Sequence, residues 1–273
     1  MKYLIVSGDS NTEANFESIS HPDWDFSYKK WPELLAEKLG MKVINLAGGG
    51  QGNEFIYTTI RNEIVKIEDK SQIGLVIAAW SQAPRKDFKN FRWTSLRTDT
   101  HGNLPWWVER SLGFYLDLQI LCERYNIPYV QFQMIELFEQ YFSGYPSQTE
   151  IHYGADPNKQ RKYPGNKTKD EELILKSIME YEKKLDTSKF MGWPPVKKLG
   201  GWRFKDHLDL WEDTNSPRRV STLDNHPNEL GHIAVCDKLN KLLQKQIKQK
   251  IFKKRYYNII DRIGKYYNAK HNS

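Results

Sequence analysis

The chain has no long apolar run that would mark it as a membrane or secreted protein. No uninterrupted apolar stretch in its 273 residues approaches the ~18 to 20 residues that a membrane span needs. The apolar start of the chain ends at Gly8, which makes it too short for the apolar region of a signal peptide. We therefore expect a cytoplasmic protein without a membrane span.

Cysteine is scarce, and metal-binding and nucleotide-binding patterns are missing. Cys122 and Cys236 are the only cysteines and fall in amphipathic helical patterns, so free buried thiols in a reducing compartment are favoured. A fortuitous disulfide between them is the alternative. The histidines lack the spacing of a metal site. The glycines from Gly48 to Gly52 form neither a phosphate-binding loop nor a dinucleotide motif, so we expect no cofactor and no metal.

The basic charge is concentrated at the end of the chain. The net charge is +7, but residues 238–273 alone carry eleven Lys or Arg and one acid, so the remainder sums to −3. Apolar residues at three- and four-residue intervals from Phe252 to Ile263 predict a helix with one apolar face. The favoured interpretation is a helix docked on the domain. The alternative is a contact between residues 238–273 and nucleic acid or another acidic surface.

Strands and helices alternate in the first half of the chain, which predicts a parallel sheet with helices on both faces. Strands are expected at residues 2–6, 42–46, 74–79 and 128–134, and helices at 28–39, 53–67, 108–125, 169–184 and 227–250. A fifth strand should precede the last helix at an undefined position. We expect one α/β domain over residues 1–250, with loop-rich insertions at about 80–107 and 144–222. A basic, aromatic helical tail over 251–273 should follow it.

The strongest functional signal is Gly8-Asp9-Ser10, directly after the first predicted strand. Ligands of open α/β sheets bind beyond the carboxyl ends of the strands, where Ser10 would lie. More than two hundred residues later, Asp224 and His226 supply an acid and a histidine. Each segment alone is ordinary, as a strand-to-turn sequence or a helix cap, but together they contain the parts of a nucleophilic hydrolase.

Three segments together resemble the SGNH/GDSL hydrolases, serine esterases and lipases with a flavodoxin-like, three-layer α/β/α sandwich. Gly8-Asp9-Ser10 is similar to the first block of that superfamily, residues 45–50 to the second and residues 224–232 to the last. The resemblance implies that Ser10 is the nucleophile, His226 the base and Asp224 the acid, with a covalent acyl-enzyme. It also implies that the backbone N–H groups of Ser10 and Gly50 form the oxyanion hole.

The sequence departs from the family pattern in two blocks. The third block normally supplies an asparagine that donates to the oxyanion, and here Ser81 stands in its place. Candidates for the missing donor are Ser81, Gln82 and Asn53. In the last block the acid usually lies three residues before the histidine, a position held here by Leu223, so we assign Asp224. Other carboxylates that could replace it are Asp206, Asp209 and Asp213. The altered third block is similar to that of hydrolase-like proteins of tailed phages, so a phage-encoded protein is one option, and the richness in Lys and Asn suggests an AT-rich genome.

Tryptophans in and beside the insertions suggest a substrate class. Aromatic faces with a polar edge suit sugar rings, and the candidates are Trp80, Trp106, Trp107 and Trp202. The alternative is that these residues pack the insertions onto the sheet. We expect a serine hydrolase that deacylates an acylated carbohydrate. There are two alternatives. One is a weak or inactive binding protein of the same fold, and the other is a particle- or nucleic-acid-associated protein that acts through the tail.

Overall fold

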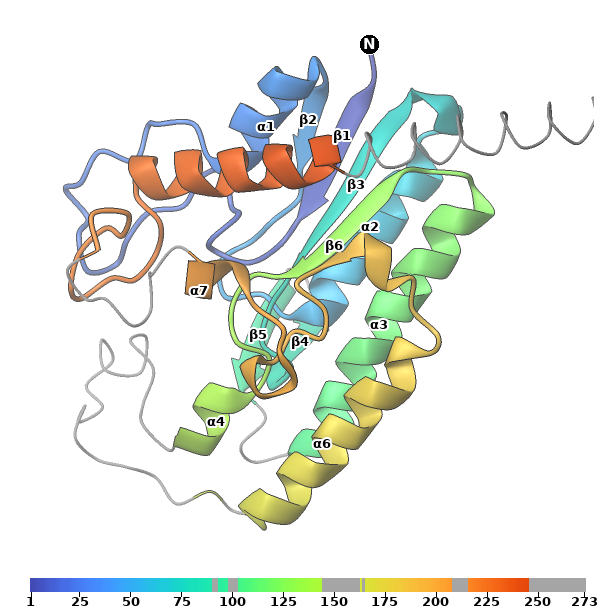
Figure 1. Ribbon diagram of the computed structural model, residues 1–273. Coiled ribbons are helices and arrows are strands. Elements are labelled where there is room, and N and C mark those ends of the chain that lie inside the picture. Colours follow the sequence, from blue (N-terminus) through green and yellow to red (C-terminus); the bar gives the residue numbers. More distant parts are fainter. Residues whose placement is uncertain (90–92, 98–102, 144–162, 164, 208–215, 246–273) are drawn as a thin grey trace, which may run out of the picture.

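Five parallel strands form the central sheet (Figure 1). The computed structural model describes residues 1–89, 93–97, 103–143, 163, 165–207 and 216–245. The strands are β1 (Tyr3–Ser7), β2 (Lys42–Asn45), β3 (Ile73–Trp80), β6 (Tyr129–Gln133) and β7 (Phe190–Met191). They lie in the order β2-β1-β3-β6-β7, and all their pairings are parallel. This is the flavodoxin-like strand order, so the predicted fold class is confirmed.

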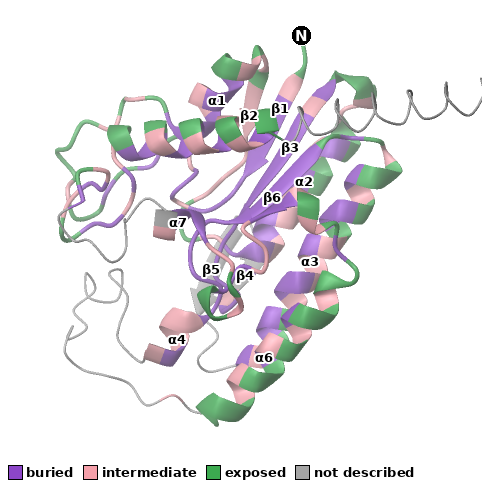
Figure 2. Cartoon of the chain, viewed as in Figure 1, coloured by how far each residue is buried: buried purple, intermediate pink, exposed green. Residues whose placement is uncertain are grey.

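Helices cover both faces of the sheet and complete the three layers (Figure 1). One face packs against α2 (Asn53–Lys66), α3 (Leu104–Arg124) and α6 (Lys167–Glu182). The other packs against α1 (Trp31–Leu39) and a helix over residues 229–245. Side chains of β1 alternate between the two cores, with Ile5 in one and Leu4 and Val6 in the other. In Figure 2, β3 and β6 are buried, whereas the exposed residues lie on the outer surfaces of the helices.

The helix boundaries follow local signals where those signals are present. Pro32 lies in the first turn of α1, and Gly40 ends the helix with φ 64°, in the left-handed region. Helix α3 begins at Leu104, one turn before the predicted start, because the Asn103 side chain accepts a hydrogen bond from the Trp106 N–H. The prediction of a helix start at residue 108 was therefore wrong.

The described part of the predicted loop-rich insertion at 80–107 also contains strands. They form an antiparallel hairpin of β4 (Arg85–Lys89) and β5 (Trp93–Arg97). The strand β4 is mostly charged, so it lacks the apolar alternation that marks a strand. Asp87 ties this hairpin to the start of α2, accepting hydrogen bonds from the Gly52 N–H (2.7 Å) and the Phe55 N–H (2.9 Å).

The remaining elements are short. They are α4 (Glu139–Ser143), α7 (Phe204–His207) and the 3-10 turns at Lys70–Gln72, Thr187–Lys189 and Lys197–Leu199. The fifth strand, β7, spans only two residues, too few for a sequence pattern. Cys122 and Cys236 are buried free thiols, as predicted. Within the described residues, no helix combines the length and apolarity that crossing a membrane requires. The predicted tail, 251–273, lies outside the described residues.

Candidate active site

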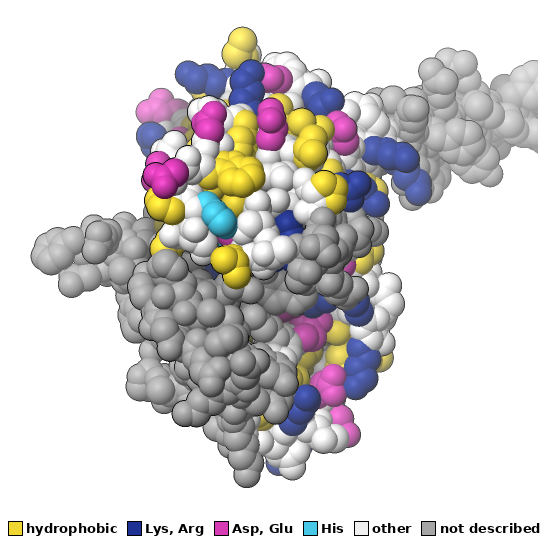
Figure 3. All heavy atoms as spheres, turned by 90° about the vertical axis from the view of Figure 1, so that its left-hand side faces the viewer, with side chains coloured by type: hydrophobic (Ala, Val, Ile, Leu, Met, Phe, Trp, Pro, Cys, Tyr) yellow, Lys and Arg dark blue, Asp and Glu magenta, His cyan; other side chains and the backbone are white. Residues whose placement is uncertain are grey.

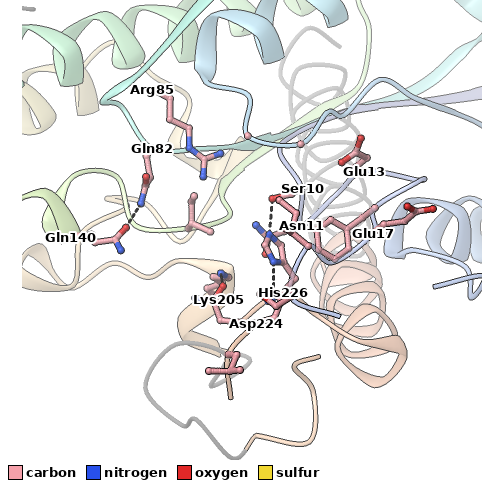
Figure 4. Close-up of a pocket in the computed structure, with 18 of the residues that line it drawn as sticks. Ser10, Asn11, Glu13, Glu17, Gln82, Arg85, Gln140, Lys205, Asp224 and His226 are labelled. Carbon is pink, nitrogen blue, oxygen red and sulfur yellow. Dashed lines mark hydrogen bonds and ion pairs between the residues drawn. The ribbon is translucent and has the colours of Figure 1, made fainter. Parts of the chain in front are cut away.

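A pocket of about 370 Å³ lies beyond the carboxyl ends of the central strands (Figure 4). Residues that follow four different strands line it: Ser10 after β1, Gly50 after β2, Gln82 after β3 and Glu136 after β6. The chain order of the strands reverses between β1 and β3, the point where open α/β sheets bind ligands.

Ser10 lies in a tight turn directly after β1. The N–H groups of Thr12 and Glu13 both donate to the Asp9 carbonyl, at 2.8 and 3.1 Å. A Cβ atom at Gly8 would lie 2.5 Å from Thr12 Oγ1, so only glycine allows this close approach. The turn leaves Ser10 half-buried at the edge of the pocket.

The structure brings Ser10, His226 and Asp224 together in a chain of hydrogen bonds (Figure 4). Ser10 Oγ lies 2.7 Å from His226 Nε2, and His226 Nδ1 lies 2.5 Å from Asp224 Oδ1. The His226 N–H also donates to Asp224 Oδ1, at 2.9 Å. This local turn lets an acid only two residues before the histidine reach its ring.

The Asp224 carboxylate is held in its charged form. Burial alone would raise its pKa, but hydrogen bonds from the His226 ring and from the Ser18 hydroxyl outweigh burial and hold the pKa well below its usual range. A charged carboxylate at Nδ1 leaves Nε2 of a neutral imidazole free to accept the proton of Ser10.

The loop between β1 and α1 contacts Asp224, His226 and the segment before them from the other side. Ser18 Oγ donates to Asp224 Oδ2. The Phe16 ring packs on the His226 ring, with 4.3 Å between centroids, and His21 Nε2 lies 2.6 Å from Ser221 Oγ. These residues could not be identified from the sequence, because no local pattern links them to a segment two hundred positions away.

His232 is separate from this constellation. It is 1% exposed and does not line the pocket. Its Nδ1 accepts a hydrogen bond from the Trp31 N–H, at 3.3 Å. His226 is therefore the histidine that the structure places at Ser10.

Two backbone N–H groups at the pocket are unpaired. Gly50 has φ 70°, a left-handed conformation that favours glycine, and lines the pocket beside Ser10. In the part of the chain that the structure describes, neither the Ser10 N–H nor the Gly50 N–H donates a hydrogen bond to the protein. Both remain available to a ligand.

Two of the three candidates for the side-chain donor face away from the pocket. Ser81 is fully buried and donates to Asp9 Oδ2, at 3.1 Å. The Asn53 amide donates to the Ser81 carbonyl and to Ser111 Oγ, at 3.2 and 3.0 Å, which ties α2 to β3 and α3. Neither residue lines the pocket, so this arrangement gives no support to either of them as an oxyanion donor.

Gln82 does line the pocket, but its donors are occupied. Its Nε2 donates to Glu136 Oε1 and to Gln140 Oε1, each at 2.7 Å. An amide nitrogen carries only two protons, so Gln82 has none left for a ligand in this arrangement.

None of the four candidate tryptophans lines the pocket. Trp80 is fully buried in the core and donates to Gln131, so it cannot contact a substrate. Trp107 is buried at the start of α3, and Trp106 lies against it and is 50% exposed. Trp202 packs on Phe204. The expectation that these tryptophans form the substrate site is not supported, and Trp80 and Trp202 instead pack in the two cores.

Charged side chains that the sequence analysis did not single out line the pocket. Burial lowers the pKa of Lys205 to about 8, although the Glu136 carboxylate acts in the opposite direction. Lys205 Nζ donates to Asn225 Oδ1, at 2.8 Å. Burial also raises the pKa of Glu13, partly offset by a backbone hydrogen bond from Gly49. Arg85 enters from the start of β4 (Figure 4).

The mouth of the pocket carries exposed hydrophobic side chains. Ile19 and Leu223 line it and are 59% and 63% exposed. On the face shown in Figure 3, hydrophobic side chains occur in small groups among charged and polar ones. Nowhere in the described residues do three or more His, Cys, Asp or Glu side chains form a group that could hold a metal ion.

Comparison with known proteins yields only distant structural similarity. No protein-family model and no curated protein sequence matches the chain. The psychrotrophic esterase EstA from Pseudoalteromonas sp. is 13% identical, with a TM-score of 0.47 over 91% of this chain and 100% of that one. TesA is 13% identical, with a TM-score of 0.47 over 89% of this chain and 99% of its own. The acetyl xylan esterase AlAXEase is 14% identical, with a TM-score of 0.43 over 88% of this chain and 98% of its own. The role of each residue must therefore be inferred from this chain's own geometry.

Proposed function

We propose that the chain is a serine hydrolase of carboxylic esters, of the SGNH type that its sequence resembles. The observation that carries the proposal is the chain of hydrogen bonds from Ser10 through His226 to Asp224, at 2.7 and 2.5 Å, at the edge of an open pocket. A serine within hydrogen-bond reach of a histidine that a buried carboxylate orients is the arrangement of an activated nucleophile.

The proposed reaction has two halves. Ser10 Oγ attacks the ester carbonyl carbon while its proton passes to His226 Nε2. The tetrahedral intermediate then collapses, and the imidazolium returns this proton to the departing alcohol. Water attacks the resulting acyl-enzyme, again losing a proton to His226, and the carboxylic acid leaves as Ser10 regains its proton. The N–H groups of Ser10 and Gly50 would donate to the oxyanion in both halves.

For the substrate, we propose an acylated carbohydrate or a similar polyhydroxyl alcohol. Support comes from the polar side chains of the pocket rather than from the tryptophans. Carboxylates and amides that line it suit the hydroxyl groups of a sugar, and they include Asn11, Glu13, Glu17 and Gln140. Ile19 and Leu223 would contact the acyl part at the mouth.

A weak or inactive binding protein is the second candidate. The observation that favours it is the Ser81 side chain, which stands in the asparagine position of the family and is turned toward Asp9. Loss of one oxyanion donor lowers turnover by a factor of about 10² to 10³.

Hydrolysis of acetyl esters by the wild-type protein and by Ser10→Ala separates these candidates. We expect the turnover of Ser10→Ala to be lower than that of the wild-type protein by a factor of more than about 10³. Ser27→Ala is the matched control, because Ser27 is exposed and outside the pocket lining, and it should match wild type. A folded wild-type protein without turnover would favour the binding protein, and an active Ser10→Ala variant would refute Ser10 as nucleophile.

A further inference from the structure

Arg85 joins the two chain segments that carry the unpaired N–H groups. Its Nη1 donates to Asp9 Oδ2 at 3.4 Å and to the Gln51 carbonyl at 3.1 Å. Asp9 immediately precedes Ser10, and Gln51 immediately follows Gly50. The guanidinium therefore spans the two edges of the space in which the Ser10 and Gly50 N–H groups would hold an oxyanion.

The guanidinium also has donors to spare. An arginine carries five N–H donors, and the two on Nη1 are used by Asp9 and Gln51. Within the described ranges, the remaining three, on Nε and Nη2, have no protein partner. The side chain is 18% exposed and lines the pocket, and Figure 4 shows it pointing into the pocket with Ser10 and His226 across from it.

The position of Arg85 is fixed by the hairpin that carries it. Two residues along β4, Asp87 binds the N–H groups of Gly52 and Phe55 and so anchors the strand to the glycine loop. A Cβ atom at Gly52 would lie only 2.9 Å from Arg85 Cβ, so the strand and the loop are in direct contact. A donor held in this way needs little reorganisation when charge develops beside it.

We propose that Arg85 is the third donor to the oxyanion, in place of the asparagine that the third block of the family supplies. The inference rests on the proposed ester hydrolysis and adds a catalytic residue to it. Negative charge that forms on the former carbonyl oxygen is stabilised by the guanidinium without proton transfer, because arginine stays protonated at every working pH. Ser81 and Arg85 bind the same oxygen of Asp9. The serine that replaces the asparagine of the family is therefore linked to Arg85 through the Asp9 carboxylate.

The variants Arg85→Lys and Arg85→Gln test this role, with Arg110→Gln as the matched control. Arg110 also forms an ion pair, with Glu54 at 2.7 Å, but lies outside the pocket lining. Arg85→Lys keeps a positive charge near the buried Asp9. It should therefore still fold, and so allow the test, if Arg85→Gln does not. For a small neutral ester we expect kcat to fall about 10²- to 10³-fold in Arg85→Gln, with KM within about threefold. The fall in Arg85→Lys should be at least about tenfold, and Arg110→Gln should match wild type.

A boronic acid that forms a tetrahedral adduct on Ser10 supplies a second readout. Its dissociation constant should rise in parallel with the loss of kcat/KM across the Arg85 variants, since the adduct places a charged oxygen where the oxyanion forms. If Arg85 had a merely structural role, its substitution would weaken the binding of the substrate and of the boronic acid equally.

Three results would overturn the inference. In the first, folded Arg85 variants keep kcat and KM within about threefold of wild type. In the second, KM rises while kcat is kept, which would make Arg85 a contact to the substrate ground state. In both cases a wild-type protein that hydrolyses esters would leave the proposed function standing. A wild-type protein that neither hydrolyses esters nor forms an adduct at Ser10 would overturn both.

Discussion

Ser18 donates its hydroxyl proton to Oδ2 of Asp224, the carboxylate oxygen that His226 does not use. The two residues are 206 positions apart in the chain, and Ser18 is 2% exposed. With one oxygen held by Ser18 and the other by the ring and N–H of His226, the carboxylate has a single orientation. Ser18 is thus a positioning residue for the acid.

The substitution Ser18→Ala should lower both activity and stability. The hydrogen bond reaches a charged group, so its loss should reduce the free energy of unfolding by about 1.5 to 3 kcal/mol. We expect kcat to fall about tenfold with KM nearly unchanged, because the imidazole is less well oriented while the pocket is intact. Steady-state kinetics and urea unfolding measure the two effects. Unchanged kcat in a destabilised protein would show that Ser18 serves the fold alone.

The sequence predicts the main layers of the fold, and it singles out the three residues that the structure brings together at Ser10, because both have local signals. Apolar periodicity marks β1, β3 and α2, and the segments around Ser10 and His226 carry recognisable residue combinations. By contrast, β4 is too charged and β7 too short for such a signal.

The contacts that complete the site could not be predicted from the sequence. Arg85 meets Asp9 across 76 positions and Ser18 meets Asp224 across 206, and only the folded sheet brings these segments together. The same holds for Trp80, which was a candidate for contacting a sugar ring but whose side chain lies in the core.

Stability should depend on His232 in mildly acidic solution. Burial lowers its pKa to about 3, and the nearby charge of Lys30 acts in the same direction. The unfolded chain, with a histidine pKa of about 6.5, binds more protons than the folded chain between these two values. The free energy of unfolding therefore decreases as the pH falls below about 6.5, by up to about 1.4 kcal/mol per pH unit from this residue.

The variant His232→Gln should remove this contribution, since glutamine does not titrate and its carbonyl can still accept the Trp31 N–H. Urea unfolding at several pH values between about 5 and 7.5 compares the slopes of the two proteins. Parallel slopes for wild type and His232→Gln would mean that His232 is not kept neutral by burial.

The most direct test of the central claim is covalent labelling of Ser10 by a fluorophosphonate. A serine activated by His226 should attack phosphorus and expel fluoride, while an ordinary hydroxyl should not react at a comparable rate. The intact mass of the folded wild-type protein should increase by one phosphonyl group, and peptide mapping should place that group on Ser10. Ser27→Ala should react like wild type, and Ser10→Ala should not react. A folded wild-type protein that gains no group at Ser10, or a Ser10→Ala variant that is labelled as fast as wild type, would contradict the assignment of Ser10 as the nucleophile.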